Sequence, residues 1–230
     1  IQILLQNAIE NLEQPSSENP PQIDDLIFGG EASKWISTAK ALQARYHLHL
    51  SRRDLNAAEK ALDAIHSGAF EMISEQPDFP FGNNLNEANP LPLYLFERPD
   101  QIVMSDYLYG LLDSTNDPRL EHLAIMIDGE PHIYRQDSTQ LFWGQFNTAL
   151  PLISLTELKF IEAEAYLLLG NLEDAENAFI KAVTAHFEQM NMGHLNFDPI
   201  LSNLIHFQNH DTFEEQLEWL IQQKHIALFA

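Results

Sequence analysis

Two neighbouring segments in the second half of the chain carry the clearest helical pattern of apolar positions. Between Ser154 and Glu188, apolar residues recur at steps of three and four, first before Gly170 and then after it. The two stripes are Leu158, Ile161, Ala165 and Leu168, then Leu172, Ala175, Ala178, Phe179 and Ala182. Ser154 and Glu157 form an S-x-x-E capping box, and Gly170 suits the left-handed end of a helix. The pattern predicts two antiparallel helices whose alanines let the axes approach closely.

A second copy of this pattern lies 117 positions earlier. Asp54–Leu62 matches Asn171–Phe179 in its turn residue, its leucine, its alanines and its closing large apolar residue. The helix before it carries one apolar stripe, formed by Trp35, Ala39, Leu42, Tyr46 and Leu50. We therefore predict helical hairpins over Lys34–Ser67 and Ser154–Glu188. Such hairpins are typical of tetratricopeptide repeats, which normally follow one another at about 34 residues, so a long insertion separates these two.

The insertion, Pro77–Pro151, is irregular and holds eight of the twelve prolines. Within it, only Val103–Leu112 has the apolar spacing of a helix, while Leu91–Phe96 and His132–Gln136 are candidates for short strands. Pro92 makes the first of these a poor central strand. Because long irregular regions inside compact domains usually carry function, we expect the insertion to face the ligand.

The helical pattern reaches both ends of the chain. Gln2–Glu13 is in helical phase from its first residue, and a final helix beginning at Asp211 continues to Ala230 without a stop residue. We therefore expect a single, all-α domain over residues 1–230 that is truncated at both ends. Any signal peptide or lipid-attachment site would then lie outside this chain.

Composition narrows the classes of partner. The formal charge is −22, from 34 acidic and 12 basic residues, and such a surface repels phosphate backbones, which argues against nucleic-acid binding. No apolar run reaches the roughly 18 residues that a membrane-spanning helix needs. The absence of cysteine excludes disulfides and thiolate metal sites.

Motifs for catalysis and metal binding are absent from the sequence. It contains no G-x-S-x-G, H-E-x-x-H, G-x-x-x-x-G-K or G-x-G-x-x-G, and nothing singles out a pair of carboxylates. His47 and His49 stand two apart on a predicted helix and therefore diverge. His206 and His210 have the i, i+4 spacing of zinc ligands, yet no motif marks a third ligand. We expect no enzymatic activity, no bound metal and no cofactor.

Aromatic residues of the insertion are the best candidates for ligand contacts. Sugars place their apolar C–H faces against flat rings, and each such contact is worth roughly 1 kcal/mol by analogy with aromatic pairs. Phe142 and Trp143 stand in the polar context DSTQLFWGQFN, where no periodic pattern requires a buried ring. Tyr107 and Tyr109 lie on the expected short helix, and Tyr134 precedes an arginine. The alternative is that these rings pack the insertion onto the helices.

Other conspicuous side chains have structural explanations. Trp35 and Trp219 lie on helical stripes and are expected in the core. Asp117-Pro118-Arg119 reads as a turn, in which the arginine ties loop carbonyls or a carboxylate.

Several landmarks follow one another in a specific order. They are FGGEASKWISTAKALQARYHLHLS, SGAF, NEANPLPLYLF, NDPRL, PLISLTELKFIEAEAYLLLGN and EEQLEWLIQQKHIALF. Taken together, this order resembles the SusD/RagB family, the outer-membrane lipoproteins of Bacteroidetes nutrient-uptake systems, over nearly the whole chain. His225 departs from the tryptophan that is common in the family's last motif. The family's lipidated N-terminal cysteine and C-terminal half-domain are not in this chain.

The resemblance implies a mostly helical, SusD-like protein with tetratricopeptide-like pairs as its scaffold. Family members bind glycans or peptides on an irregular face and act as lids over a TonB-dependent (SusC-like) transporter. We therefore expect a non-enzymatic cell-surface lipoprotein that captures oligosaccharide and is held at the outer membrane by a lipid anchor outside this chain. The alternative function is a tetratricopeptide-type adaptor that binds another protein.

Overall fold

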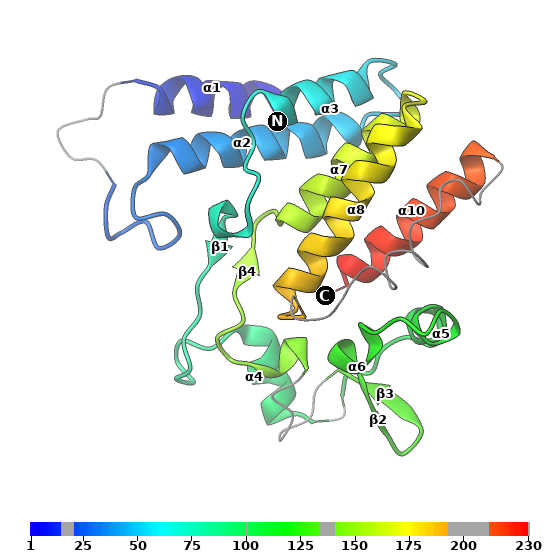
Figure 1. Ribbon diagram of the computed structural model, residues 1–230. Helices are drawn as coiled ribbons and strands as arrows, with labels where there is room; N and C mark the ends of the chain where they lie inside the picture. The colour runs from blue at the N-terminus through cyan, green and yellow to red at the C-terminus, as the bar shows by residue number, and fades with distance from the viewer. Residues whose placement is uncertain (15–20, 100, 134–140, 193–211, 230) are drawn as a thin grey trace. The chain divides into compact units, whose positions relative to one another are not determined.

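The computed structural model describes residues 1–14, 21–99, 101–133, 141–192 and 212–229, which fall into two compact units. Residues 1–77 and 151–230 form the helical unit, and residues 78–150 form the insertion unit. Helices dominate the chain (Figure 1), and the strands of its described parts form two small two-stranded sheets. The predicted α fold, with tetratricopeptide-like hairpins and a long irregular insertion, is confirmed. A single domain truncated at both ends stays a prediction.

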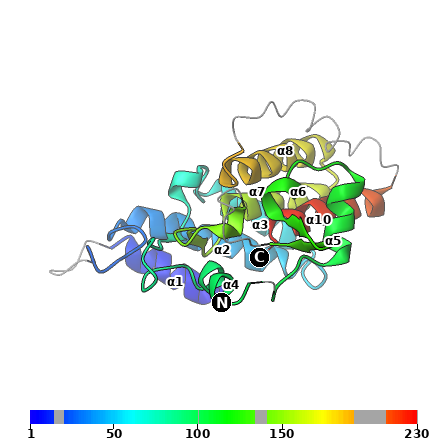
Figure 2. The same cartoon turned by 90° about the horizontal axis from the view of Figure 1, so that it is seen from below.

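Antiparallel hairpins build the helical unit. Its helices are α1 (Gln2–Leu12), α2 (Ala32–Leu48), α3 (Ala57–His66), the 3-10 turn η1 (Ile73–Glu75), α7 (Leu155–Leu168), α8 (Leu172–Gln189) and α10 (Phe213–Ala227). α2 pairs with α3 and α7 with α8, while α1 packs on α2 and α10 packs on α7 (Figures 1 and 2). Thr212 caps α10, whereas Asp211, the predicted start of this helix, lies outside the described residues.

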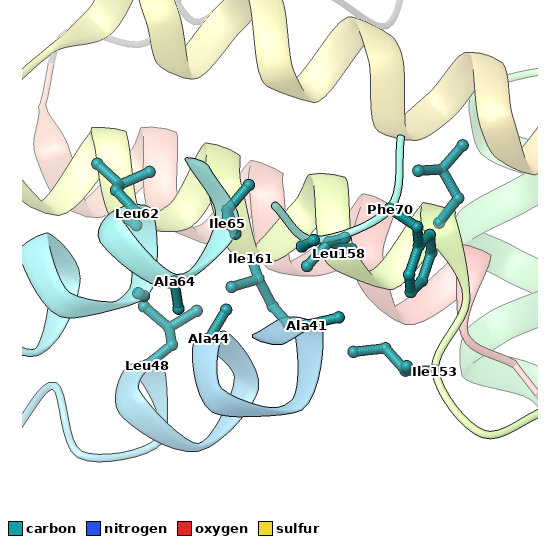
Figure 3. Packing of buried hydrophobic residues seen from close by; sticks show 14 of the residues in the cluster. Ala41, Ala44, Leu48, Leu62, Ala64, Ile65, Phe70, Ile153, Leu158 and Ile161 are labelled. Carbon is teal, nitrogen blue, oxygen red and sulfur yellow. The ribbon is translucent and has the colours of Figure 1, made fainter. Parts of the chain in front are cut away.

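One apolar core joins the two hairpins. Side chains from α2, α3 and α7 meet there, together with Phe70 after α3 and Ile153 before α7 (Figure 3). The main contributors are Ala41, Ala44, Leu48, Leu62, Ile65, Leu158 and Ile161. Burying each leucine or isoleucine contributes about 1.5–3 kcal/mol, so this core is the main source of stability of the helical unit.

The buried face of α2 differs from the predicted stripe. Of the five predicted residues only Ala39 is buried, and Leu50 lies beyond the helix with an exposed side chain. The buried residues of α2 are Thr38, Ala39, Ala41, Ala44 and Leu48. The prediction was wrong because it followed the large apolar side chains, whereas close packing against α3 and α7 selects the side with small ones. Leu168 and Leu172, at the turn of the second hairpin, are exposed as well.

Trp35 and Trp219 are half-buried instead of forming part of the core. The indole N–H of Trp35 donates to Asp25 Oδ2 over 2.7 Å, and its ring meets that of Phe28 edge-on, with centroids 5.1 Å apart. Trp35 therefore holds the loop before α2 through a polar contact that apolar periodicity does not reveal.

Asp25 organises the loop that contains the FGG sequence. Its carboxylate also accepts hydrogen bonds from the backbone N–H groups of Ile27, Phe28 and Gly30. Gly30 has a φ of +89°, and a Cβ at this position would collide with the carbonyl oxygen of Pro21. Only glycine combines this backbone conformation with so close an approach.

The predicted ends of the α7 hairpin helix are confirmed, with one change. The Ser154 hydroxyl accepts from the N–H of Glu157 over 3.0 Å, and Gly170 has a φ of +76°. The Glu157 carboxylate takes a different partner from the one expected of a capping box. It binds Arg45 of α2 through two hydrogen bonds, Nε–Oε1 of 2.6 Å and Nη2–Oε2 of 2.5 Å. This bidentate ion pair links one hairpin to the other.

Short elements make up the insertion unit. They are β1 (Asp78–Phe79), α4 (Pro90–Glu97), α5 (Asp106–Ser114), α6 (Leu120–Leu123), β2 (Ile125–Ile127), β3 (Glu130–His132) and η2 (Phe142–Gly144), and the unit ends within β4 (Leu150–Pro151). β2 and β3 pair antiparallel, with Met126 opposite Pro131, and β1 pairs with β4.

Two secondary-structure predictions in the insertion need correction. Leu91–Phe96 lies in helix α4, because the Asn89 side chain caps the N-terminus and Pro90 occupies the first helical position, where a missing N–H costs nothing. The helix expected over Val103–Leu112 starts only at Asp106. In His132–Gln136, His132 ends β3, and residues 134–136 lie outside the described residues.

Candidate functional site

Helix α4 of the insertion unit presents two partly exposed aromatic rings. Tyr94 and Phe96 each keep 39% of their surface accessible. The guanidinium of Arg98 lies over the Tyr94 ring at 5.5 Å, and Phe96 meets Phe146 edge-on with centroids 5.5 Å apart. Because Tyr94 and Phe96 stand two positions apart on a helix, they face different sides. They therefore supply two separate contact positions.

Hydrogen bonds from one buried asparagine fix α4 against the segment that follows η2. The Asn89 backbone N–H donates to the Phe146 carbonyl and its Nδ2 donates to the Thr148 carbonyl, each over 2.8 Å. Its Oδ1 accepts from the N–H of Leu91 over 3.0 Å. Thr148 Oγ1 in turn donates to the carbonyl of Phe142 over 3.2 Å. These hydrogen bonds of Asn89 and Thr148, here called the Asn89 frame, thus fix the positions of the Phe96–Phe146 pair and of η2.

The predicted contact residues occupy two places in the insertion unit. Phe142 is half-buried in η2, which packs against α4. The backbone of Trp143 belongs to the same turn, but its side chain is outside the described set, as is the whole of Tyr134. Tyr107 and Tyr109 lie on α5, where Tyr107 is 63% exposed and Tyr109 is half-buried. The structure therefore groups Phe142 with α4 and places the two tyrosines on another helix.

Sequence analysis missed Tyr94, Phe96 and Phe146. The strand predicted over Leu91–Phe96 does not indicate that Tyr94 and Phe96 are exposed rings of a helix. The signal that was available is Asn89-Pro90, an N-cap followed by proline at the first helical position.

The Asp117–Arg119 pair serves the structure of the insertion unit. Both side chains are fully buried, with Nε–Oδ1 at 2.9 Å and Nη2–Oδ2 at 2.5 Å. Asp117 also accepts from the backbone N–H of Arg119 over 2.9 Å. This geometry agrees with the structural reading of the Asp-Pro-Arg turn and leaves the guanidinium out of reach of a ligand.

Titratable groups of the helical unit form a second polar cluster around Glu162. Its carboxylate lies 2.8 Å from Lys159 Nζ and 3.5 Å from His66 Nε2, and the Tyr166 hydroxyl lies 3.3 Å from the same ring nitrogen. Burial raises the pKa of Tyr166, and the nearby carboxylates of Glu162 and Asp174 raise it further. These groups satisfy one another at the contact between α3 and α7.

The described residues offer neither a metal site nor a membrane-spanning helix. Within these residues, no group of three or more histidine and acidic side chains is placed to hold a metal ion, while His206 and His210 lie outside them. None of the described helices combines the length and apolar character needed to cross a bilayer.

The chain matches one protein-family model and is similar in fold to several solved structures. The family model SusD-like_2, described as "Starch-binding associating with outer membrane", matches residues 2–230. A SusD/RagB family protein from Bacteroides thetaiotaomicron superposes with a TM-score of 0.76 at 23% identity, covering 99% of this chain and 56% of that one. A SusD homolog from Bacteroides ovatus gives 0.76 at 17% identity, with 99% and 56% covered. No curated protein matches the sequence.

A third structure is similar in fold. It is a Bacteroides vulgatus protein, provisionally described as an outer membrane protein involved in nutrient binding, with a TM-score of 0.79 at 18% identity and coverage of 99% and 59%. The chain therefore spans a little more than half the length of these structures. At such identities the likeness shows a common fold, and the ligand has to be argued from this chain's own residues.

Proposed function

This chain belongs to the SusD-like_2 family, and from this premise we propose that its protein captures oligosaccharide at the outer-membrane surface for import. The match over residues 2–230 is the observation that carries the proposal, and it confirms the resemblance to the SusD/RagB family that the order of motifs indicated. The captured ligand would pass to a TonB-dependent, SusC-like transporter. A lipid anchor outside this chain would hold the protein at the cell surface.

The insertion unit offers suitable contacts for a glycan. Rings at Tyr94, Phe96 and Tyr107 are exposed on short helices, and the Asn89 frame holds α4 beside η2, which carries Trp143. Flat rings with neighbouring amide and carbonyl groups match the apolar faces and hydroxyl edges of sugars. Rings held by a hydrogen-bonded frame also lose less freedom on binding.

A binding role without catalysis is part of the proposal. The sequence lacks motifs of activated nucleophiles and metal sites. The carboxylates of Asp117 and Glu162 are committed to Arg119 and Lys159. A hydrolase would need an available acid and base at hydrogen-bonding distance from a substrate. Incubating the full-length protein with starch should release no reducing ends.

Titration calorimetry on the full-length protein tests the proposal. We expect starch-derived oligosaccharide to bind, and Trp143→Ala or Phe96→Ala to weaken its affinity about fivefold each, since one ring contact is worth about 1 kcal/mol. Phe213→Ala, which removes an exposed ring of α10, is the matched control and should leave affinity unchanged. Affinity for this neutral ligand should hardly change with salt, because no counterions are released.

Two results would contradict glycan binding at the α4–η2 surface. Unchanged affinity in both insertion variants would remove the α4–η2 surface from the site. Absence of binding to any neutral glycan, together with capture of a partner protein that depends on the hairpins, would favour the adaptor function instead.

A further inference from the structure

A hollow of about 550 Å³ lies on the helical unit, where α2 ends beside α7 and α10. Its polar lining comes from the end of α2 and the turn before α3, from α7 and from α10. The residues concerned are His49, Ser51, Arg52, Arg53, Glu164 and Lys224. Volumes of this order suit small ligands such as one or two sugar rings.

The lining is positive in a strongly negative protein. Three cations, Arg52, Arg53 and Lys224, face a single carboxylate, Glu164, so the hollow carries a formal charge of +2 while the chain carries −22. Lys224 Nζ lies 2.9 Å from Glu164 Oε2, which largely neutralises both. The charge that remains belongs to the two arginines.

These arginines differ from most other cations of the chain. Lys34, Arg45, Lys60, Arg119 and Lys159 each form an ion pair with a carboxylate. Within the described residues, the guanidinium groups of Arg52 and Arg53 have neither an ion pair nor a hydrogen bond, although acidic residues outnumber basic ones 34 to 12. Arg98 and Lys181 share this property, but the Arg98 guanidinium lies over the Tyr94 ring and Lys181 is an exposed residue of α8.

The donor set of the hollow matches a carboxylate attached to a hydroxyl-rich ring. A guanidinium binds carboxylate oxygens through two parallel N–H donors, which an ammonium cannot reproduce. Ser51 adds a hydroxyl, and the His49 ring is held edge-on to Tyr46 with centroids 5.9 Å apart. Hydrogen-bond donors therefore outnumber acceptors in the lining of the hollow, and a matching ligand has to supply acceptor atoms.

We propose that this hollow binds the carboxylate of a uronic acid residue in an oligosaccharide, at a site on the helical unit distinct from the insertion aromatics. The assignment rests on the proposed role in glycan capture and names acidic glycans as its substrate class. A protein segment is the competing occupant, and Leu55 distinguishes the two. Leu55 is 98% exposed next to the arginines but does not line the hollow, so a docked protein would cover it and a sugar would not.

The test compares acid and ester forms of the same probe on the full-length protein. Trigalacturonate and triglucuronate are titrated calorimetrically beside their methyl esters, which keep the rings and lose the charge. We expect at least one acid to bind tenfold or more tightly than its ester, with an affinity that falls as salt rises. R52Q/R53Q should abolish this preference, whereas K34Q/K181Q, which removes the same charge elsewhere, should retain it.

Failure of the uronate site can be distinguished from failure of the proposed glycan capture. Equal binding of acids and esters, or an acid preference that survives R52Q/R53Q, overturns the uronate site while leaving neutral glycan binding intact. Absence of neutral glycan binding by the wild-type protein overturns the proposed function itself. If R52Q/R53Q and Leu55→Ser both weaken association with a co-purifying protein and no acid preference exists, the hollow is a protein-docking surface and the uronate proposal is wrong.

Discussion

The helical unit and the insertion unit differ in how polar groups accompany their buried apolar side chains. In the helical unit, apolar side chains from α2, α3 and α7 meet in one core, and the Arg45–Glu157 pair at its edge adds a link between hairpins. In the insertion unit, short elements bury apolar side chains such as Leu108 and Leu112 and are also joined by buried polar groups, chiefly Asn89 and the Asp117–Arg119 pair. Apolar packing tolerates substitutions that conserve volume, whereas a buried polar network fails when one member is lost.

This difference has a functional consequence. A scaffold built from packed helices keeps its shape while its surface residues change. An irregular insertion that is fixed by a few buried polar residues can accept substitutions of the aromatic residues between them and still keep its backbone conformation. This arrangement agrees with the glycan contacts that we propose on the insertion.

The largest effect is expected at the buried ion pair of the insertion unit. Arg119→Ala leaves the Asp117 carboxylate buried without its partner, which should cost about 3–5 kcal/mol. The insertion unit should then open at lower denaturant than the helical unit, as measured by hydrogen exchange of amides in each unit. Replacing both residues by apolar ones of similar size should recover much of the loss, because no charge is left unpaired. Equal losses in single and double variants would contradict a network held by polar pairing.

A smaller loss is expected for a core substitution in the helical unit. Leu158→Ala removes a fully buried side chain between the hairpins and should lower the free energy of unfolding by about 2–5 kcal/mol. Leu158→Met, which conserves volume, should cost less than about 1.5 kcal/mol. Chemical denaturation followed by circular dichroism measures both. A Met variant as unstable as the Ala variant would show that this core depends on shape as strictly as the insertion depends on its polar pairs.

The smallest effect is expected at Asp25 and should depend on pH. Desolvation raises the pKa of this carboxyl, but the hydrogen bonds from Trp35 and from the N–H groups of Gly30, Phe28 and Ile27 together outweigh it and hold the pKa below 3.8. A lowered pKa stabilises the folded protein above pH 3.8, and this contribution is lost as the pH falls through the folded value. Asp25→Asn should therefore be less stable than wild type at pH 7 and approach it in acid. A pH-independent difference in melting temperature would contradict this account.

Particular residues show why sequence reasoning succeeded for some elements and failed for others. The α7/α8 hairpin was predicted correctly because Ser154, Gly170 and the spacing of apolar residues are local signals. The α2 stripe was wrong, because the partner helices that choose its buried face lie elsewhere in the chain. Helix α4 was predicted as a strand, although Asn89 and Pro90 form a local signal for a helix N-terminus. The ligand-contact predictions at Phe142, Trp143, Tyr107, Tyr109 and Tyr134 stay predictions.

The sequence by itself determined the helical hairpins, the long insertion between them and, through the order of its motifs, the family. These depend on periodicity, caps and glycines, which act within a few residues of one another. Only the tertiary structure decided that Glu157 pairs with Arg45 and that Asn89 holds Phe146 and Thr148. Likewise, it alone brought Arg52 and Arg53 to one hollow with Lys224. Such partners are far apart in the chain, and their choice depends on distances that exist only after the helices have packed.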